Sequence, residues 1–192
     1  MDLVRRDAWG ARPPRGKPIT IATPVRDLFL HHSATPDHGV RSVKAIQVFH
    51  QDVRNYADIA YSWIYSPSER CWYEGRGPAV AGAHTRNHNR TSHAVCVLGN
   101  YEATVPPRHV IGDLAEWAYW HGGTWGPDRY RPHKDVGATA CPGRHLINLI
   151  PDINRQAAID PATVGWLEDR VASTFGDYSG WADAIEKGKT DD

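Results

Sequence analysis

The chain has 192 residues, enough for one domain with a buried core and a small appendage. With 41% hydrophobic and 23% charged residues, its composition is typical of a folded domain and argues against disorder as the main state. No apolar run approaches the roughly 20 residues that a membrane-spanning helix needs, so we expect no membrane partner. The net charge is zero, but up to Pro151 there are 18 Lys and Arg against 13 Asp and Glu. This mildly basic body has no concentrated basic stripe, so we expect no nucleic-acid partner either.

Residues 1–27 are rich in proline, and we expect an irregular arm that wraps the body with Trp9 as its packing anchor. The first 16 residues are polar and arginine-rich and lack the apolar stretch of a secretion signal. Residues 28–33 form an apolar run that turns abruptly polar, which is typical of a buried strand whose last residues enter a pocket. Because side chains alternate along a strand, only one of His31 and His32 can face that pocket.

The next segment contains a predicted helix and a predicted hairpin. Ser42 is expected to cap a helix that runs to about residue 56, because apolar residues recur at spacings of three and four. We interpret this helix as scaffold, with His50 at its border rather than in a site. Residues 59–66 and 70–74 are aromatic-rich and are predicted to pair as a hairpin.

In the second half of the chain, predicted strands alternate with predicted helices, and the whole order indicates a mixed α/β domain whose sheet is covered by helices. The loop at 79–90 is dense in hydrogen-bonding groups, as loops that line sites often are. The elements expected after it are a strand at 92–98, a helix from 106 to about 121 ended by Gly122 and Gly123, a short strand at 129–131, and a helix at 144–157 interrupted at Pro151. Beyond them we expect residues 159–192 to form an acidic helical extension or linker, with an amphipathic helix from residue 160.

The three cysteines cannot all pair and lie far apart, which argues against a disulfide framework. Cys96 lies in an apolar, β-branched run and Cys71 lies beside Trp72, so simple packing explains both. Packing does not explain Cys141, which lies in a loop of small residues eight positions after His133. His and Cys side chains both bind zinc, but this spacing is too long to identify a zinc site alone. A third ligand is needed.

His31 and His133, each at a predicted strand end, together with Cys141 in the following loop, would supply three ligands. Catalytic zinc sites keep three protein ligands and one open position, whereas structural sites close with four. The count therefore fits a catalytic site that holds one zinc ion. Such an ion lowers the pKa of bound water to about 7 and polarises a carbonyl, which indicates hydrolysis of an amide or an ester. A nearby hydroxyl donor is expected to stabilise the oxyanion.

Seven short segments carry a resemblance to a known family. They are residues 9–11, 30–35, 58–61, 73–77, 82–85, 92–101 and 133–143. In this order they resemble the zinc-dependent N-acetylmuramoyl-L-alanine amidases, which include amidase-type phage lysozymes and the peptidoglycan recognition proteins. The resemblance implies a catalytic domain at residues 1–158, with a central mixed β-sheet flanked by helices and a groove across one face. It also implies that His31, His133 and Cys141 bind one zinc ion and that His32 does not.

The resemblance also assigns roles around the metal. Tyr61 and Thr139 match positions that assist the oxyanion in catalytic members, although the second position carries either Lys or Thr there. A hydroxyl offers a hydrogen bond but no fixed charge, so the role implied for Thr139 is that of an uncharged hydrogen-bond donor. His84 and Asn89 match positions that contact the muramyl-peptide. The alternative for Tyr61 is an ordinary sheet aromatic, and for the last two plain loop residues.

The function implied is hydrolysis of the amide bond between N-acetylmuramic acid and L-alanine in peptidoglycan. The alternative is a module that binds peptidoglycan without cutting it; such relatives typically lose the Cys ligand, and Cys141 is present here. A structural zinc domain would need a fourth ligand. The likeness to phage enzymes and the absence of a secretion signal together predict a monomeric endolysin. It would stay in the host cytoplasm until lysis and then act on the bacterial cell wall.

Overall fold

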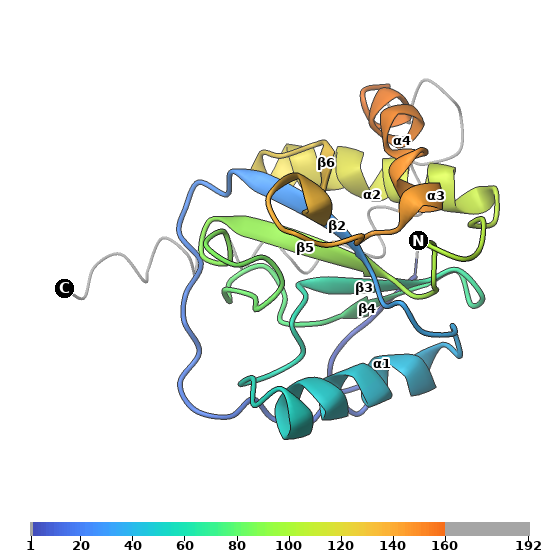
Figure 1. Ribbon diagram of the computed structural model, residues 1–192. Helices are drawn as coiled ribbons and strands as arrows, with labels where there is room; N and C mark the ends of the chain where they lie inside the picture. The colour runs from blue at the N-terminus through green and yellow to red at the C-terminus, as the bar shows by residue number, and fades with distance from the viewer. Residues whose placement is uncertain (1, 160–192) are drawn as a thin grey trace.

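A six-stranded sheet lies at the centre of the protein, with helices on both of its faces (Figure 1). The computed structural model describes residues 2–159, so the expected extension with its amphipathic helix lies outside the described residues. The strand order is β1-β4-β3-β5-β2-β6, and every neighbouring pair is parallel except the β3–β4 hairpin. The predicted fold class, a mixed sheet flanked by helices, is confirmed. In the part of the chain that the structure describes, no helix could cross a bilayer.

The elements follow the predicted order, with one strand added at the start. The strands are β1 (Asp2–Val4), β2 (Asp27–His32), β3 (Trp63–Ser66), β4 (Cys71–Glu74), β5 (Ser92–Val97) and β6 (Tyr130–Pro132). The helices are α1 (Val40–Val48), the π-helical segment η1 (Phe49–Val53), α2 (His109–Trp125), the 3-10 turn η2 (His133–Asp135), α3 (Arg144–Ile147) and α4 (Ile150–Ala157).

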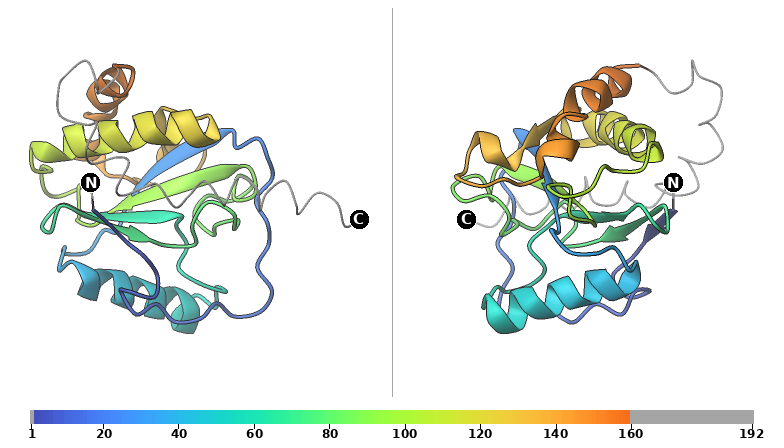
Figure 2. Two further views of the ribbon diagram at one scale, coloured as in Figure 1. Left: turned by 180° about the vertical axis from the view of Figure 1, so that it is seen from behind. Right: turned by 45° about the vertical axis from the view of Figure 1, so that its right-hand side comes forward.

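The sheet separates two hydrophobic cores, because successive side chains of a strand point to opposite faces. Helix α1 covers one face, and α2 with α4 covers the other (Figure 2). On β5, Val95 and Val97 belong to the core under α2, whereas Cys96 between them belongs to the core under α1. On β2, Leu30 belongs to the α2 side. His31, the next residue, therefore projects on the α1 side of the sheet.

A pair of fully buried histidines joins the sheet to α2. Nδ1 of His93, on β5, lies 2.7 Å from Nε2 of His121, on α2. Their other ring nitrogens face the carbonyls of Pro78 and Pro127, at 2.9 and 2.6 Å. Burial lowers the pKa of His93 to about 4 and lowers that of His121 as well. The two rings therefore tie β5 to α2 through side chains that lie entirely inside the protein.

The N-terminal arm is more regular than expected at its start. Residues of β1 pair in parallel with β4, an arrangement that the local sequence does not reveal because three residues take their conformation from the neighbouring strand. Trp9 is the packing anchor that the sequence predicted. It is 2% exposed, and its indole N–H donates to the carbonyl of Glu74 at 2.9 Å.

Two helix ends differ from the predictions. Helix α1 begins at Val40 after Gly39, and the Ser42 hydroxyl donates to the Pro36 carbonyl instead of capping the helix. Helix α2 does not end at Gly122 and Gly123 but continues to Trp125, whose ring lies 5.0 Å from that of Trp63. This aromatic packing offsets the low helix propensity of the two glycines. Gly126, with φ of 107°, then ends the helix.

The predicted interruption of the last helix is confirmed, and it falls before the proline. Helix α3 ends at Ile147 and α4 begins at Ile150. Pro151 lies in the first turn of α4, where its missing N–H removes no intrahelical hydrogen bond.

Candidate active site

The sheet places two histidines next to each other at the ends of neighbouring strands. Strands β2 and β6 are parallel, and Leu30 pairs with Pro132. The following residues, His31 and His133, therefore lie side by side at the carboxyl ends of the two strands. Their ring centroids lie 4.5 Å apart. The carboxyl ends of parallel strands are where α/β folds commonly hold their ligands.

The loop after η2 brings Cys141 back to His31 and His133 at this end of the sheet. The backbone N–H of Lys134 donates to the Cys141 carbonyl at 3.0 Å, and the Cys141 N–H donates to the Thr139 hydroxyl at 3.1 Å. Sγ of Cys141 consequently lies 3.5 Å from Nδ1 of His31. One ligand atom from each of His31, His133 and Cys141 lies within 4.8 Å of the others. Two imidazole nitrogens and one thiol sulfur fit a zinc ion with an open position.

The environment of the cluster keeps both imidazoles neutral. Burial lowers the pKa of His31, and the neighbouring His84 and His133 lower it further. Burial also lowers the pKa of His133. Neutral imidazole has the lone pair that a metal requires. Burial raises the pKa of the Cys141 thiol to about 11, so a bound metal would displace the thiol proton.

A groove of about 380 Å³ opens over the cluster. Its lining includes the two residues that the sequence analysis proposed for the oxyanion, Tyr61 and Thr139. The Tyr61 ring lies 5.2 Å from the His31 ring. Burial, with smaller contributions from the Cys96 and Cys141 thiols, holds the pKa of the Tyr61 phenol well above its usual range. The phenol therefore keeps its proton and remains a hydrogen-bond donor, whereas Thr139 is exposed.

His84 and Asn89 occupy different positions relative to the groove. His84 lines it, is 7% exposed, and lies edge-on to His31 with centroids 5.6 Å apart. Asn89 is not among the lining residues. Its side-chain oxygen accepts the backbone N–H groups of His84 and Thr85 at 2.9 and 2.8 Å. It organises the loop from inside, and contact of either residue with substrate stays a prediction.

Several groove residues were not identified from the sequence. They are Ala34, Phe49, His50, Arg54, Tyr56, Ala60, Ala83 and Ala140. His32 also borders the groove, so the prediction that only one of His31 and His32 faces it is wrong. The prediction that His50 lies outside a site is wrong, since η1 carries it to the groove wall, where its Nδ1 accepts the N–H of Ala60 at 3.1 Å. No α-helical spacing marks His50, because η1 is a π-helical segment.

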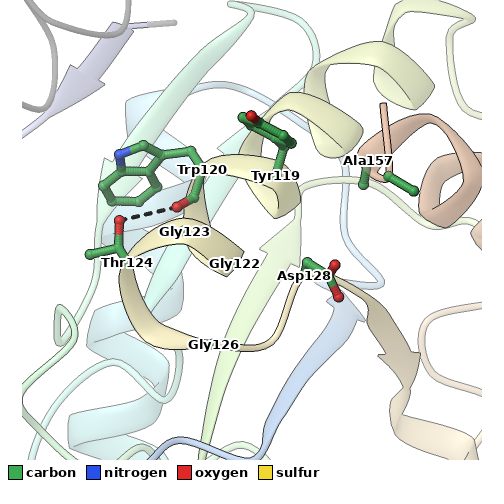
Figure 3. A pocket seen from close by; sticks show the side chains of 9 residues that line it. Tyr119, Trp120, Gly122, Gly123, Thr124, Gly126, Asp128 and Ala157 are labelled. Carbon is green, nitrogen blue, oxygen red and sulfur yellow. Dashed lines mark hydrogen bonds between the residues drawn. The ribbon is translucent and has the colours of Figure 1, made fainter. Parts of the chain in front are cut away.

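A second hollow, of about 540 Å³, lies where α2 and α4 end (Figure 3). Its lining includes Tyr119, Trp120 and Asp128 but no histidine or cysteine. In Figure 3 the Thr124 hydroxyl points back to its own helix, where it donates to the Trp120 carbonyl at 3.1 Å. This hollow therefore lacks the metal-ligand chemistry of the groove.

The fold and the site together define a class: α/β domains with a His-His-Cys cluster at the carboxyl ends of parallel strands, beside a groove. No family model matches the chain. Among curated proteins it is 33% identical to mouse N-acetylmuramoyl-L-alanine amidase over 76% of this chain and 29% of that protein. It is 31% identical to peptidoglycan-recognition protein SC2 of Drosophila simulans over 77% of this chain and 84% of the relative. The chain thus belongs to the family of N-acetylmuramoyl-L-alanine amidases and peptidoglycan recognition proteins.

Solved structures agree with this assignment. Drosophila peptidoglycan recognition protein LB superposes with a TM-score of 0.69 at 27% identity, over 79% of this chain and 91% of that one. Peptidoglycan recognition protein LE in complex with tracheal cytotoxin gives a TM-score of 0.71 at 26% identity, over 80% and 92%. The chain spans only 29%, 26% and 27% of the mouse, pig and human amidases that it matches.

Proposed function

We propose that the protein is a zinc-dependent N-acetylmuramoyl-L-alanine amidase, which hydrolyses the amide between the lactyl group of N-acetylmuramic acid and L-alanine. The observation that carries the proposal is the cluster of His31, His133 and Cys141 at the floor of the groove. The donor set leaves one position of a tetrahedral ion for water or substrate. Family membership supplies the substrate class, because the named relatives include amidases.

The chain's own groups divide the chemistry between them. His31, His133 and Cys141 would hold the ion, which when bound supplies a Lewis acid that activates water and polarises the scissile carbonyl. The Tyr61 phenol, protonated because burial raises its pKa, donates a hydrogen bond to the developing oxyanion. The Thr139 hydroxyl accepts a hydrogen bond from the Cys141 N–H. It can still donate its own proton to the developing oxyanion. The groove walls orient the muramyl-peptide across these groups.

The second candidate function is recognition of peptidoglycan without cleavage. Two observations favour it: several relatives are named recognition proteins, and solved neighbours carry bound tracheal cytotoxin or a glycosamyl muramyl pentapeptide. Thr139 also offers no fixed charge beside the reacting carbonyl. Both functions use the same groove and the same partner, bacterial peptidoglycan, so they differ only in whether the amide is cut.

Mass spectrometry of a muropeptide digest distinguishes the two. Purified muropeptides are incubated with zinc-loaded protein, with protein treated with a chelator, and with the Cys141→Ala variant. The Cys71→Ala variant is the matched control, because Cys71 lies on β4, which β3 and β5 separate from β2. Free peptide beginning at L-alanine, abolished by chelator and by Cys141→Ala but not by Cys71→Ala, supports the amidase. Intact muropeptide that co-elutes with zinc-loaded protein supports recognition alone.

We further propose that the protein acts as a phage endolysin, held in the host cytoplasm until lysis and functioning as a monomer. The support is the likeness of its motifs to amidase-type phage lysozymes. Expression inside a bacterial host, with and without a protein that permeabilises the inner membrane, tests it: lysis only with permeabilisation is the expected result.

A further inference from the structure

Thr85 is a buried residue next to the metal cluster that the proposed mechanism does not use. It is 1% exposed, and its hydroxyl oxygen lies 3.3 Å from Nε2 of His31 and 3.0 Å from Nδ1 of His84. Its backbone N–H donates to the side-chain oxygen of Asn89 at 2.8 Å. The hydroxyl therefore lies at a fixed position between two histidines.

The two nitrogens of His31 face different partners. Nδ1 lies 3.5 Å from the Cys141 sulfur, so Nδ1 is the nitrogen that faces a metal ion. A metal on Nδ1 uses its lone pair, and the single ring proton must then sit on Nε2. The group within reach of that proton is the Thr85 hydroxyl oxygen. His31 would thus donate to Thr85 while its other nitrogen binds the ion.

The proton of the Thr85 hydroxyl has an acceptor as well. A threonine hydroxyl that accepts one hydrogen bond still has its own hydrogen to donate. Nδ1 of His84 lies 3.0 Å from the hydroxyl oxygen and can accept this hydrogen. Gly82 leaves the space for the His84 ring, because a Cβ at this position would lie 2.1 Å from Cδ2 of the ring. Every polar atom of Thr85 is then satisfied.

We propose that Thr85 is a positioning residue for the metal centre: it holds the His31 ring by accepting its Nε2 proton, so that Nδ1 is presented to zinc. This inference rests on the proposed zinc site and names the support behind its most buried ligand. Outer partners of this kind fix the tautomer and the orientation of ligating histidines, and losing one typically weakens metal binding 10- to 100-fold. Asn89 acts one step further out, since it holds the backbone of Thr85.

The test measures zinc affinity by competition with a chromophoric chelator, in the absence of substrate. Thr85→Val keeps the shape of the side chain and removes the hydroxyl, and its zinc affinity is expected to fall about 10- to 100-fold. Thr85→Ser keeps the hydroxyl and should stay within about threefold of the wild type. Thr91→Val is the matched control, because the Thr91 hydroxyl donates to the His88 carbonyl in the same loop.

Nitrogen-15 NMR of the histidine rings supplies a second readout that a merely structural role would not move. Zinc-loaded wild type should show the His31 proton on Nε2 and the metal on Nδ1. A metal on Nε2, or a Thr85→Val variant that binds zinc within twofold of the wild type, overturns the inference while leaving the amidase proposal standing. A wild type that binds no zinc overturns both. If Thr85→Val does not fold, the wild-type spectrum and Thr85→Ser decide.

Discussion

The phenol of Tyr61 offers the sharpest test of the site at the scale of one residue. Tyr61→Phe removes the donor and keeps the ring that packs beside His31. We expect kcat to fall about 100-fold with zinc affinity unchanged, because a single oxyanion donor contributes about 10²–10³ to kcat. Steady-state cleavage of a muramyl-peptide measures the rate. Tyr119→Phe, on the outer side of α2, is the control, and an unchanged kcat for Tyr61→Phe would remove Tyr61 from the mechanism.

The role of a residue could be predicted from the sequence where the chemistry of its side chain is specific, as for metal ligands. It could not be predicted where the local backbone conformation determines the position of the side chain. The cluster of His31, His133 and Cys141 was predicted from residue types and strand ends, and the structure brings the three together. His50 was misplaced because η1 widens the helix locally, and a π-helical segment leaves little trace in side-chain periodicity. The hydrogen bonds from the backbone of His84 and Thr85 to Asn89 could not be predicted, because they depend on the loop conformation.

At the scale of elements, the sequence predicted the strands and helices that have a strong hydrophobic pattern. It predicted the ends of these elements less accurately. The β3–β4 hairpin and strand β5 follow from their aromatic and β-branched runs. Strand β1 was missed since its conformation comes from β4. The end of α2 was placed too early, because glycine is a frequent helix terminator and only tertiary packing carries the helix past Gly122 and Gly123.

The glycines of α2 give a prediction at this scale. A Cβ at Gly123 would meet nothing within 4 Å, whereas a Cβ at Gly122 would lie 2.5 Å from that of Asp128. Gly123→Ala should therefore stabilise the protein by about 0.5–1 kcal/mol through helix propensity. Gly122→Ala should cost about 1–3 kcal/mol through overpacking. Urea denaturation measures both, and a destabilising Gly123→Ala would mean that the helix does end before this residue.

At the scale of the whole molecule, buried histidines link folding to pH. Burial lowers the pKa of His93 and of His50 to about 4, and lowers that of His121 too. The unfolded chain takes up protons on these rings near pH 6.5, whereas the folded protein does not protonate His93 or His50 until about pH 4. Their contribution to stability is therefore fully present above pH 6.5 and declines as the pH falls, by up to about 1.4 kcal/mol per pH unit for each histidine.

Urea midpoints of metal-free protein at pH 7.5 and 5.5 test this expectation, and the midpoint should be clearly lower at pH 5.5. Metal-free protein is used so that loss of zinc does not contribute. His38→Gln, at an exposed position, should leave the pH dependence unchanged. A midpoint that does not change between the two pH values would mean that the folded protein protonates these rings without cost.

The position of β6 in the sheet gives the metal a mechanical role as well as a chemical one. Strand β6 is an edge strand of only three residues. The side-chain amide of Asn154 accepts the N–H of Tyr130 and donates to its carbonyl. An ion bound by both His31 and His133 would cross-link the end of β6 to β2. Zinc should therefore slow hydrogen exchange at Lys134, which follows β6, and leave the β3–β4 hairpin unaffected. When zinc is scarce, the β6 edge of the protein should therefore open before its hydrophobic cores do.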